Sequence, residues 1–304
     1  MANEIKFDFL KYRTVALVVS TVLIAASVFA LSTNGLKFGI DFTGGTLIEL
    51  GYVEAPNLDE IRNTIADSDL GDAVVQTFGS PRDVLVRLAP TESLADAEVS
   101  NKVLALLPGA EMRRIEFVGP QVGEELTEDG GFAMLYALAG ILIYVMFRFT
   151  LKFSAGAIAA LVHDVLIVLG FFAITQIEFD LPVLAAILAV IGYSLNDTIV
   201  VFDRIRENFR RMRKGDTTTV INTSLNQTFS RTVITSLTTL LVLVALFFLG
   251  GELIHAFATA LIVGVLVGTY SSIYVASTTA IMLGVGKEDL MPVQKEGAEI
   301  DSRP

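Results

Sequence analysis

The 304-residue sequence has no cysteine, which excludes disulfide frameworks, thiolate metal sites and cysteine nucleophiles. Charge is also scarce, because Asp, Glu, Lys and Arg make up only 18% of the chain, against about a quarter in soluble domains. An excess of bases is missing too. The 22 Lys and Arg face 33 Asp and Glu, and this formal charge of -11 argues against a nucleic-acid partner. What remains is a chain that is 53% hydrophobic, which indicates a membrane protein.

Six apolar runs are long enough to cross a bilayer as helices, since about 20 residues suffice. They lie near 14–32, 131–149, 155–174, 181–202, 232–250 and 254–283. The first run is longer than the roughly 7–15 apolar residues of a signal peptide, so we expect a retained membrane anchor. Residues 33–130, between the first two runs, are long enough for one soluble domain.

The basic residues of the short loops predict the orientation of the chain. One side of the membrane holds Lys6, Lys11, Arg13, Arg148, Lys152 and a basic run from Arg204 to Lys214. The opposite short loops, 176–180 and 250–252, hold no Lys or Arg. We therefore expect both termini in the cytoplasm. The expected segments are 1–32 (N-terminus and first helix), 33–130 (external domain), 131–284 (five helices with a basic cytoplasmic loop at 203–230) and 285–304 (cytoplasmic tail). The basic run fits a topology anchor, and anionic lipid or a partner is its alternative target.

The external segment reads as alternating strands and helices. Strands are expected at 46–53, 73–78, 83–88 and 111–118, and helices after the cap residue Asn57 and at 93–107. The order β-α-β-β-α-β is that of a ferredoxin-like split βαβ sandwich. This segment carries 18 acids and 7 bases, so the whole charge of -11 belongs to it. We interpret the acidity as a solvated surface that repels anionic lipid.

Ionisable residues inside apolar spans are costly and therefore point to function. Away from the span ends they are His163, Asp164, Asp197 and Arg231. At about 1.5 Å per residue, all four fall in the cytoplasmic half of the bilayer and can form one cluster. Polar neighbours on the same helices are Tyr193, Ser194, Asn196, Thr235, Thr238 and Thr239. A carboxylate whose partner cation moves can change its protonation, so the cluster predicts a proton relay. The alternative is a static buried ion pair that fixes helix packing.

The last span carries small residues at every fourth position. This small-residue stripe consists of Ala256, Ala260, Gly264, Gly268, Ser272, Ala276 and Ala280. Such stripes let helix backbones approach closely in lipid. We expect the stripe to pack inside the bundle, with a partner-subunit interface as the alternative.

One enzyme class to consider for these spans is an intramembrane serine protease with a catalytic dyad of Ser194 and His163. Ser194 lacks the Gly-x-Ser-x-Gly turn that exposes such a nucleophile, and the residues Gly192–Leu195 supply no oxyanion loop. We therefore expect no enzymatic activity and no metal site.

Three motifs resemble the SecD/SecF family of the resistance-nodulation-division (RND) superfamily. They are the run Gly39–Thr46 (GIDFTGGT), Val118-Gly119-Pro120 with Val122–Leu126, and Gly192–Asn208 (GYSLNDTIVVFDRIREN). The resemblance covers nearly the whole chain. It implies a six-helix RND-like bundle with a periplasmic domain, in the bacterial inner membrane. It also implies that Asp197 and Arg231 take part in proton transport. The first motif is a family hallmark at the membrane-proximal base, formed by Gly39, Asp41, Phe42, Thr43, Gly44 and Gly45.

The resemblance further implies a role in protein export. The chain would work with SecD beside the SecYEG channel, with YajC as a further candidate partner. It would use the proton-motive force, without another cofactor, to draw unfolded preprotein out on the periplasmic side late in translocation. Two other classes stay open: a half-size RND-type exporter of small molecules or lipids, and a scaffold subunit that moves no protons.

Overall fold

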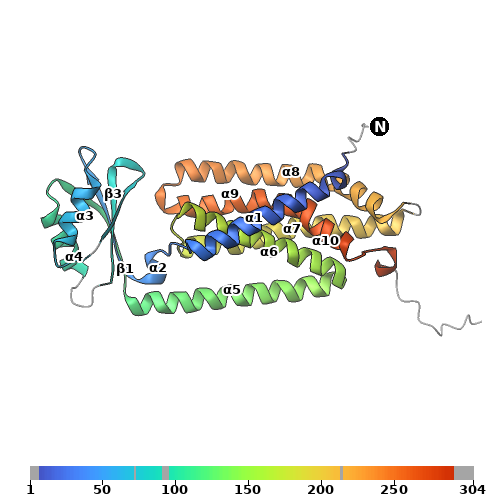
Figure 1. The fold of residues 1–304 in the computed structure, drawn as a ribbon, viewed down its shortest axis with the longest axis horizontal. Helices are drawn as coiled ribbons and strands as arrows, with labels where there is room; N and C mark the ends of the chain where they lie inside the picture. Colours follow the sequence, from blue (N-terminus) through green and yellow to red (C-terminus); the bar gives the residue numbers. More distant parts are fainter. Residues whose placement is uncertain (1–6, 72, 91–95, 213–214, 291–304) are drawn as a thin grey trace, which may run out of the picture.

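A computed structural model describes residues 7–71, 73–90, 96–212 and 215–290. The chain forms a bundle of long helices with a small α+β domain at one end (Figure 1). Lys6, Arg213, Lys214, the start of the helix expected at 93–107 and most of the C-terminal tail lie outside the described residues.

Six helical segments of the described chain are long and apolar enough to span a membrane, as the sequence predicts. They are α1 (Arg13–Thr33, preceded by the 3-10 turn η1, Phe9–Tyr12), α5 (Pro120–Arg148), α6 (Leu151–Thr175), α7 (Leu181–Arg211), α8 (Thr217–Leu249) and a last segment of three parts. Those parts are α9 (Glu252–Ser271), a π turn η2 (Ser272–Ala276) and α10 (Ser277–Met282), before the short turn η3 (Lys287–Leu290).

Three spanning helices, α5, α7 and α8, are clearly longer than their apolar runs. Helix α5 begins at Pro120 instead of near residue 131, with the proline in its first turn, where no amide hydrogen bond is lost. Helix α7 continues to Arg211 and α8 begins at Thr217, so most of the expected cytoplasmic loop 203–230 is helical and the first part of the basic run lies on α7. The apolar runs miss these extensions because the added turns are polar.

The soluble domain contains the predicted elements in the predicted order. They are β1 (Gly45–Tyr52), α3 (Leu58–Ala66), β2 (Ala73–Phe78), β3 (Ser80–Leu88), α4 (Asp96–Leu106) and β4 (Ala110–Val118). The strands form one antiparallel sheet in the order β2-β3-β1-β4. The amide of Asp59 donates to Asn57 Oδ1 at 3.0 Å, so Asn57 caps α3 as predicted.

One face of the sheet carries the core of the soluble domain. Ile48 of β1 pairs with Val86 of β3, and both are completely buried. They pack with Ile65 of α3 and Val103 of α4, which are also completely buried. The two helices cover the face of the sheet that points away from the bundle (Figure 1).

The small-residue stripe packs against α7 of the same chain. A Cβ atom on Gly264 would lie 2.1 Å from Val190 Cγ2, and one on Gly268 would lie 3.0 Å from Ser194 Cβ. Ala260 and Ser272, on the same stripe, are completely buried. The absence of side chains therefore lets α9 and α7 approach closely, which is how small residues hold helices together in lipid.

Truncating the core of the soluble domain should loosen its sheet. Ile65→Ala removes buried methyl groups and leaves a cavity, at a cost of about 2–5 kcal/mol. In the purified full chain, we expect faster amide hydrogen exchange across β1 and β3. Val53→Ala, at a side chain that is 86% exposed, is the matched control and should leave exchange unchanged. Equal exchange in both variants would contradict this account of the core.

Candidate functional site

A buried carboxylate organises the middle of the bundle. Asp164 on α6 is completely buried. Its Oδ2 atom accepts hydrogen bonds from Ser194 Oγ on α7 at 2.5 Å and from Ser271 Oγ on α9 at 2.7 Å. Its Oδ1 atom lies 2.8 Å from His163 Nδ1. Three helices therefore meet at one carboxylate, and Ser194 is bonded to Asp164 instead of forming a dyad with His163.

The imidazole of His163 extends this network to a fourth helix. His163 Nε2 lies 3.1 Å from Ser20 Oγ on α1, and Ser20 Oγ lies 3.0 Å from the Tyr270 hydroxyl. The Tyr270 hydroxyl donates in turn to the Ala16 carbonyl at 2.6 Å. Asp164 is thus linked through His163 to the first helix by groups that can each accept and donate a proton.

Asp197 occupies a separate place between α7 and α8. It is buried, and its Oδ2 atom has no hydrogen-bond partner. The groups of α8 that act electrostatically on this carboxylate are Arg231 and Thr232. The Thr232 hydroxyl is also buried and forms no hydrogen bond of normal geometry, but it is placed to donate to Asp197. A buried carboxylate oxygen is costly to leave unpaired, so this position is poised to gain a proton or a new donor.

The four charges therefore form two groups and not the single cluster expected from their depths. Asp197 and Arg231 form no hydrogen bond or ion pair, because the Arg231 side chain is exposed at the bundle surface. Asn196 is exposed as well and lies on the outer side of α7. The hydroxyl groups of Thr235 and Thr238 bond carbonyls of their own helix, at 3.0 and 2.9 Å. The expected polar side of α8 thus faces outward in this single chain.

The two groups are nevertheless close along α7. Ser194 and Asp197 are three residues apart, which makes them neighbours on one helix surface. Ser194 donates to Asp164, so one helical turn of α7 separates Asp197 from a side chain of the Asp164 network. A second set of polar contacts joins α7 to α8 and α9. Tyr193 donates to Ser236 on α8 at 3.1 Å, and Ser236 contacts Thr269 on α9 at 2.7 Å.

The glycine motif of residues 39–45 forms the joint between bundle and soluble domain. After α2 (Ile40–Thr43), Gly44 and Gly45 both have positive φ angles, +67° and +126°. A Cβ atom on Gly45 would lie 2.5 Å from the Leu88 carbonyl oxygen. Only glycine fits such a turn without strain. The ring of Phe42 packs near Phe179 of the α6–α7 loop, with centroids 6.0 Å apart.

Asp41, which has no role that the sequence reveals, caps the start of α7. The amide of Leu181 donates to Asp41 Oδ2 at 3.0 Å, and the amide of Val183 donates to Asp180 Oδ1 at 2.8 Å. Two carboxylates therefore satisfy the free amides at one helix N-terminus, where negative charge is favourable. The same helix carries Asp197 further along.

Arg87 of β3 fastens the sheet to this joint. Its guanidinium donates to the Phe38 carbonyl at 2.8 Å and to Thr43 Oγ1 at 2.5 Å, and lies 3.8 Å from Glu178. Lys37 forms a second ion pair with Glu178 at 3.1 Å. A cleft of about 340 Å³ remains between the soluble domain and the bundle, next to these groups.

Sequence reasoning missed most of the joint. Asp180 stands directly before Leu181-Pro182, which is the ordinary signal of a helix start and could have revealed the cap. Arg87 and Glu178 are far apart in sequence, and neither belongs to a motif. Only the folded chain brings them together.

Fold and site together define a class of protein: a six-helix membrane protein with a soluble α+β domain inserted after its first span. Residues 98–286 match the family described as protein export membrane protein SecD/SecF, C-terminal, and residues 29–55 match the SecD/SecF GG motif. The chain belongs to the SecD/SecF family. The family resemblance of the sequence is thereby confirmed.

Curated relatives match over nearly their full length. The protein translocase subunit SecF of Vibrio alginolyticus is 55% identical over 99% of this chain and 98% of its own. That of Pseudomonas aeruginosa is 50% identical over 98% and 97%. A crystal structure of SecDF from Thermus thermophilus, called a translocon-associated membrane protein, superposes with a TM-score of 0.85 at 38% identity. The match covers 93% of this chain but only 39% of that longer one. SecDF in a super-membrane-facing form gives a TM-score of 0.68.

The double cap at α7 predicts a pH-dependent joint. Burial raises the pKa of the Asp180 carboxyl from 3.8 to about 6, and the charges of Asp41 and Glu178 add to this rise. The folded joint therefore holds the proton more tightly than the unfolded chain, so the joint gains stability as pH falls from about 6 to about 4. Amide exchange at residues 176–183, corrected for intrinsic rates, should slow over that window.

Asp180→Asn keeps the capping oxygen and removes the titration, so it should flatten this pH dependence. Asp67→Asn, at an exposed carboxylate in the soluble domain, is the control. A pH dependence that survives in Asp180→Asn would show that another group titrates.

Proposed function

We propose that the chain is a subunit of the bacterial Sec export machinery that uses the proton-motive force to promote late-stage translocation of secreted proteins. Family membership supports the export role. The observation that carries the proton-coupled part is the buried carboxylate of Asp197, which has an unpaired oxygen one turn from the Asp164 network. Buried ionisable groups with free hydrogen-bonding capacity are what a proton path through a membrane requires. The mechanism needs neither a metal nor another cofactor.

The polar contacts suggest a route. A proton that enters at Asp197 neutralises the carboxylate and weakens its attraction to Arg231, which leaves α8 free to shift against α7. From Asp197 the proton path continues past Ser194 to Asp164 and then to His163, each step within one helical turn or one hydrogen bond. One charge that crosses the membrane potential supplies about 2.3 kcal/mol per 100 mV, enough to bias a two-state movement of helices.

Helix α7 connects this chemistry to the soluble domain. Asp197 lies in its middle, and Asp41 of the glycine motif binds its N-terminus. A shift of α7 therefore acts directly on the joint, while α1 and α5 lead into the domain from both sides (Figure 1). The domain would bind or release the emerging preprotein as the joint moves.

The remaining assignments follow from the same family. We assign the soluble domain to the ferredoxin-like split βαβ class and the bundle to the RND-like class. The strand order β2-β3-β1-β4 supports the first assignment, and the family match supports the second. Both termini would lie in the cytoplasm and the soluble domain in the periplasm. SecD would supply a matching half beside SecYEG, with YajC as a further partner. SecD would cover the outward faces of α5 and α8, which are mostly exposed in this chain.

Neutralising either charge should abolish coupling to the gradient. In inverted vesicles that contain the assembled complex, Asp197→Asn and Arg231→Met should each reduce the gradient-dependent part of preprotein export at least about tenfold, since removal of an essential proton-transfer group commonly costs 10²–10⁴. Asp164→Asn tests the extension of the path and should reduce the same signal.

Glu207→Gln and Arg210→Met are matched controls, because both residues are on the exposed end of α7 and outside the proposed path. They should keep full gradient dependence. If Asp197→Asn and Arg231→Met also keep it while the complex remains assembled, the chain is a scaffold and the relay is wrong. Export of a small molecule or lipid in place of preprotein would favour the half-size exporter.

A further inference from the structure

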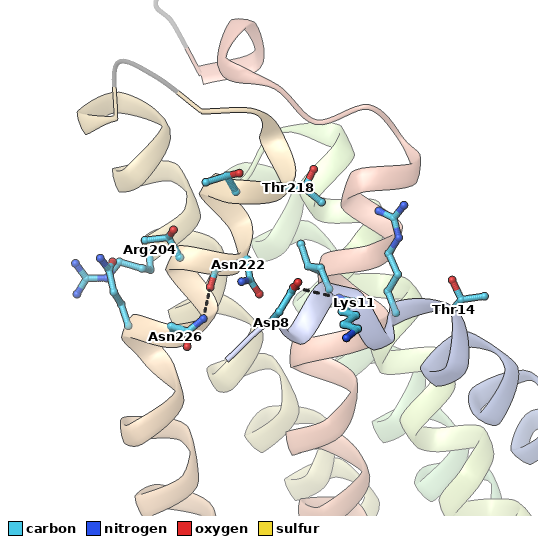
Figure 2. A pocket seen from close by; sticks show the side chains of 12 residues that line it. Asp8, Lys11, Thr14, Arg204, Thr218, Asn222 and Asn226 are labelled. Carbon is cyan, nitrogen blue, oxygen red and sulfur yellow. Dashed lines mark hydrogen bonds between the residues drawn. The ribbon is translucent and has the colours of Figure 1, made fainter. Parts of the chain in front are cut away.

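A large cavity of the described chain lies at the end of the bundle away from the sheet, where α1 begins (Figure 1). It has a volume of about 1160 Å³ and opens between η1, the start of α1, and helices α7 and α8. Figure 2 shows Lys11 and Arg204 on opposite sides of it, with Thr218 and Asn222 of α8 between them. The cavity is large enough for a whole phosphodiester headgroup, because small-molecule sites usually measure about 300–1,000 Å³.

The cavity carries more positive than negative charge. Lys11, Arg13 and Arg204 line it, against the single carboxylate of Asp8. Lys11 and Arg13 have no ion-pair partner among the residues that the structure describes. Arg204, the third cation of the cavity, contacts Glu207 at 2.9 Å, and elsewhere at this end Arg148 contacts Asp203 at 2.5 Å and Lys152 contacts Asp289 at 2.8 Å. The two free cations of the cavity thus offer a binding site for an anion.

The wall of the cavity is fixed by the chain itself. Asn226 Oδ1 accepts the amide of Phe7 at 2.8 Å, and Asn222 Oδ1 accepts the amide of Phe9 at 3.0 Å. These bonds hold the segment before α1 against α8, so Lys11 is presented to the cavity by an anchored turn. Uncharged hydrogen-bonding groups, such as the side chain of Thr223, complete the lining.

The surroundings of the cavity are those of the bilayer interface. Aromatic rings gather beside it: Phe9 lies 4.8 Å from Phe7 and 5.1 Å from Phe229, between ring centroids. Aromatic residues are enriched at headgroup depth. Directly beyond the cavity, α1 presents exposed apolar side chains, with Val15 62% and Val18 59% exposed. A ligand with an anionic head and an apolar tail matches both features, whereas a soluble anion matches only the first.

We propose that this cavity binds the phosphate headgroup of an anionic phospholipid, with its acyl chains along the exposed face of α1. Lys11 and Arg13 pair with the phosphate, and Arg204 contacts it from the opposite wall. Basic clusters at the cytoplasmic ends of spanning helices recognise anionic lipid in this manner. The bound lipid would join α1 to α8 at the end opposite the soluble domain, independently of the proton path.

The test is lipid binding to the purified full chain, measured by native mass spectrometry. Phosphatidylglycerol and phosphatidylcholine with the same acyl chains are added in parallel, with inorganic phosphate as a third arm. We expect phosphatidylglycerol to bind preferentially, and K11Q/R13Q to weaken that binding at least about tenfold, since each cation near an anionic headgroup contributes about 1 kcal/mol. Excess inorganic phosphate should displace the lipid poorly.

R210Q/R211Q removes the same charge at the same end but outside the cavity, and it should bind phosphatidylglycerol normally. Thr223→Phe fills the cavity without any change of charge, and it should weaken binding even if K11Q/R13Q disturbs membrane insertion. The proposal is overturned by equal losses in the two double variants, by equal binding of phosphatidylcholine, by normal binding in Thr223→Phe, or by ready displacement with phosphate. An acidic peptide that competes better than lipid would also overturn it.

Discussion

A carboxylate inside a membrane has no water to bond with, so the protein must supply its hydrogen-bond donors. The helices of the bundle meet this requirement at Asp164. Donors come from α6, α7 and α9, and the network reaches α1 through His163. Each donor fixes the rotation of its helix about its own axis. Gly268 permits the approach, because a Cβ atom at that position would meet Ser194, one of the donors.

The soluble domain depends on the same helix α7 in a different way. The glycine motif turns the chain from α2 into β1, and its acidic residue binds the first amides of α7. Arg87 then ties the sheet to the same motif. One helix therefore carries the intramembrane carboxylate at its middle and the attachment of the external domain at its N-terminus. A movement of α7 would therefore affect both the intramembrane carboxylate and the attachment of the external domain.

Local sequence patterns predict much of this architecture. Apolar run length predicts the spans, and alternation with turn residues predicts the strands and their order. Local patterns do not predict the contacts between segments that are distant in the sequence. The depth of Asp197 and Arg231 is readable from the sequence, but the rotation of α8 that turns Arg231 outward is set by packing. The Arg87–Glu178 contact likewise depends on how the domain is seated. Hydropathy predicts how deep a residue lies along the axis of its helix, but it does not predict the direction round that axis in which its side chain points.

The π turn at residues 272–276 has a consequence for that angle. Along an α-helix, a step of four residues advances round the axis by about 40° more than a full turn, so a row of small residues drifts sideways. A wider turn takes up part of this drift. The small residues before it touch α7. Its last residue, Ala276, and Ala280 beyond it touch α6, where a Cβ atom on Gly156 would lie 2.8 Å from the Ala276 carbonyl oxygen and 3.6 Å from the Ala280 nitrogen. One row of small side chains in sequence thereby serves two neighbouring helices in succession.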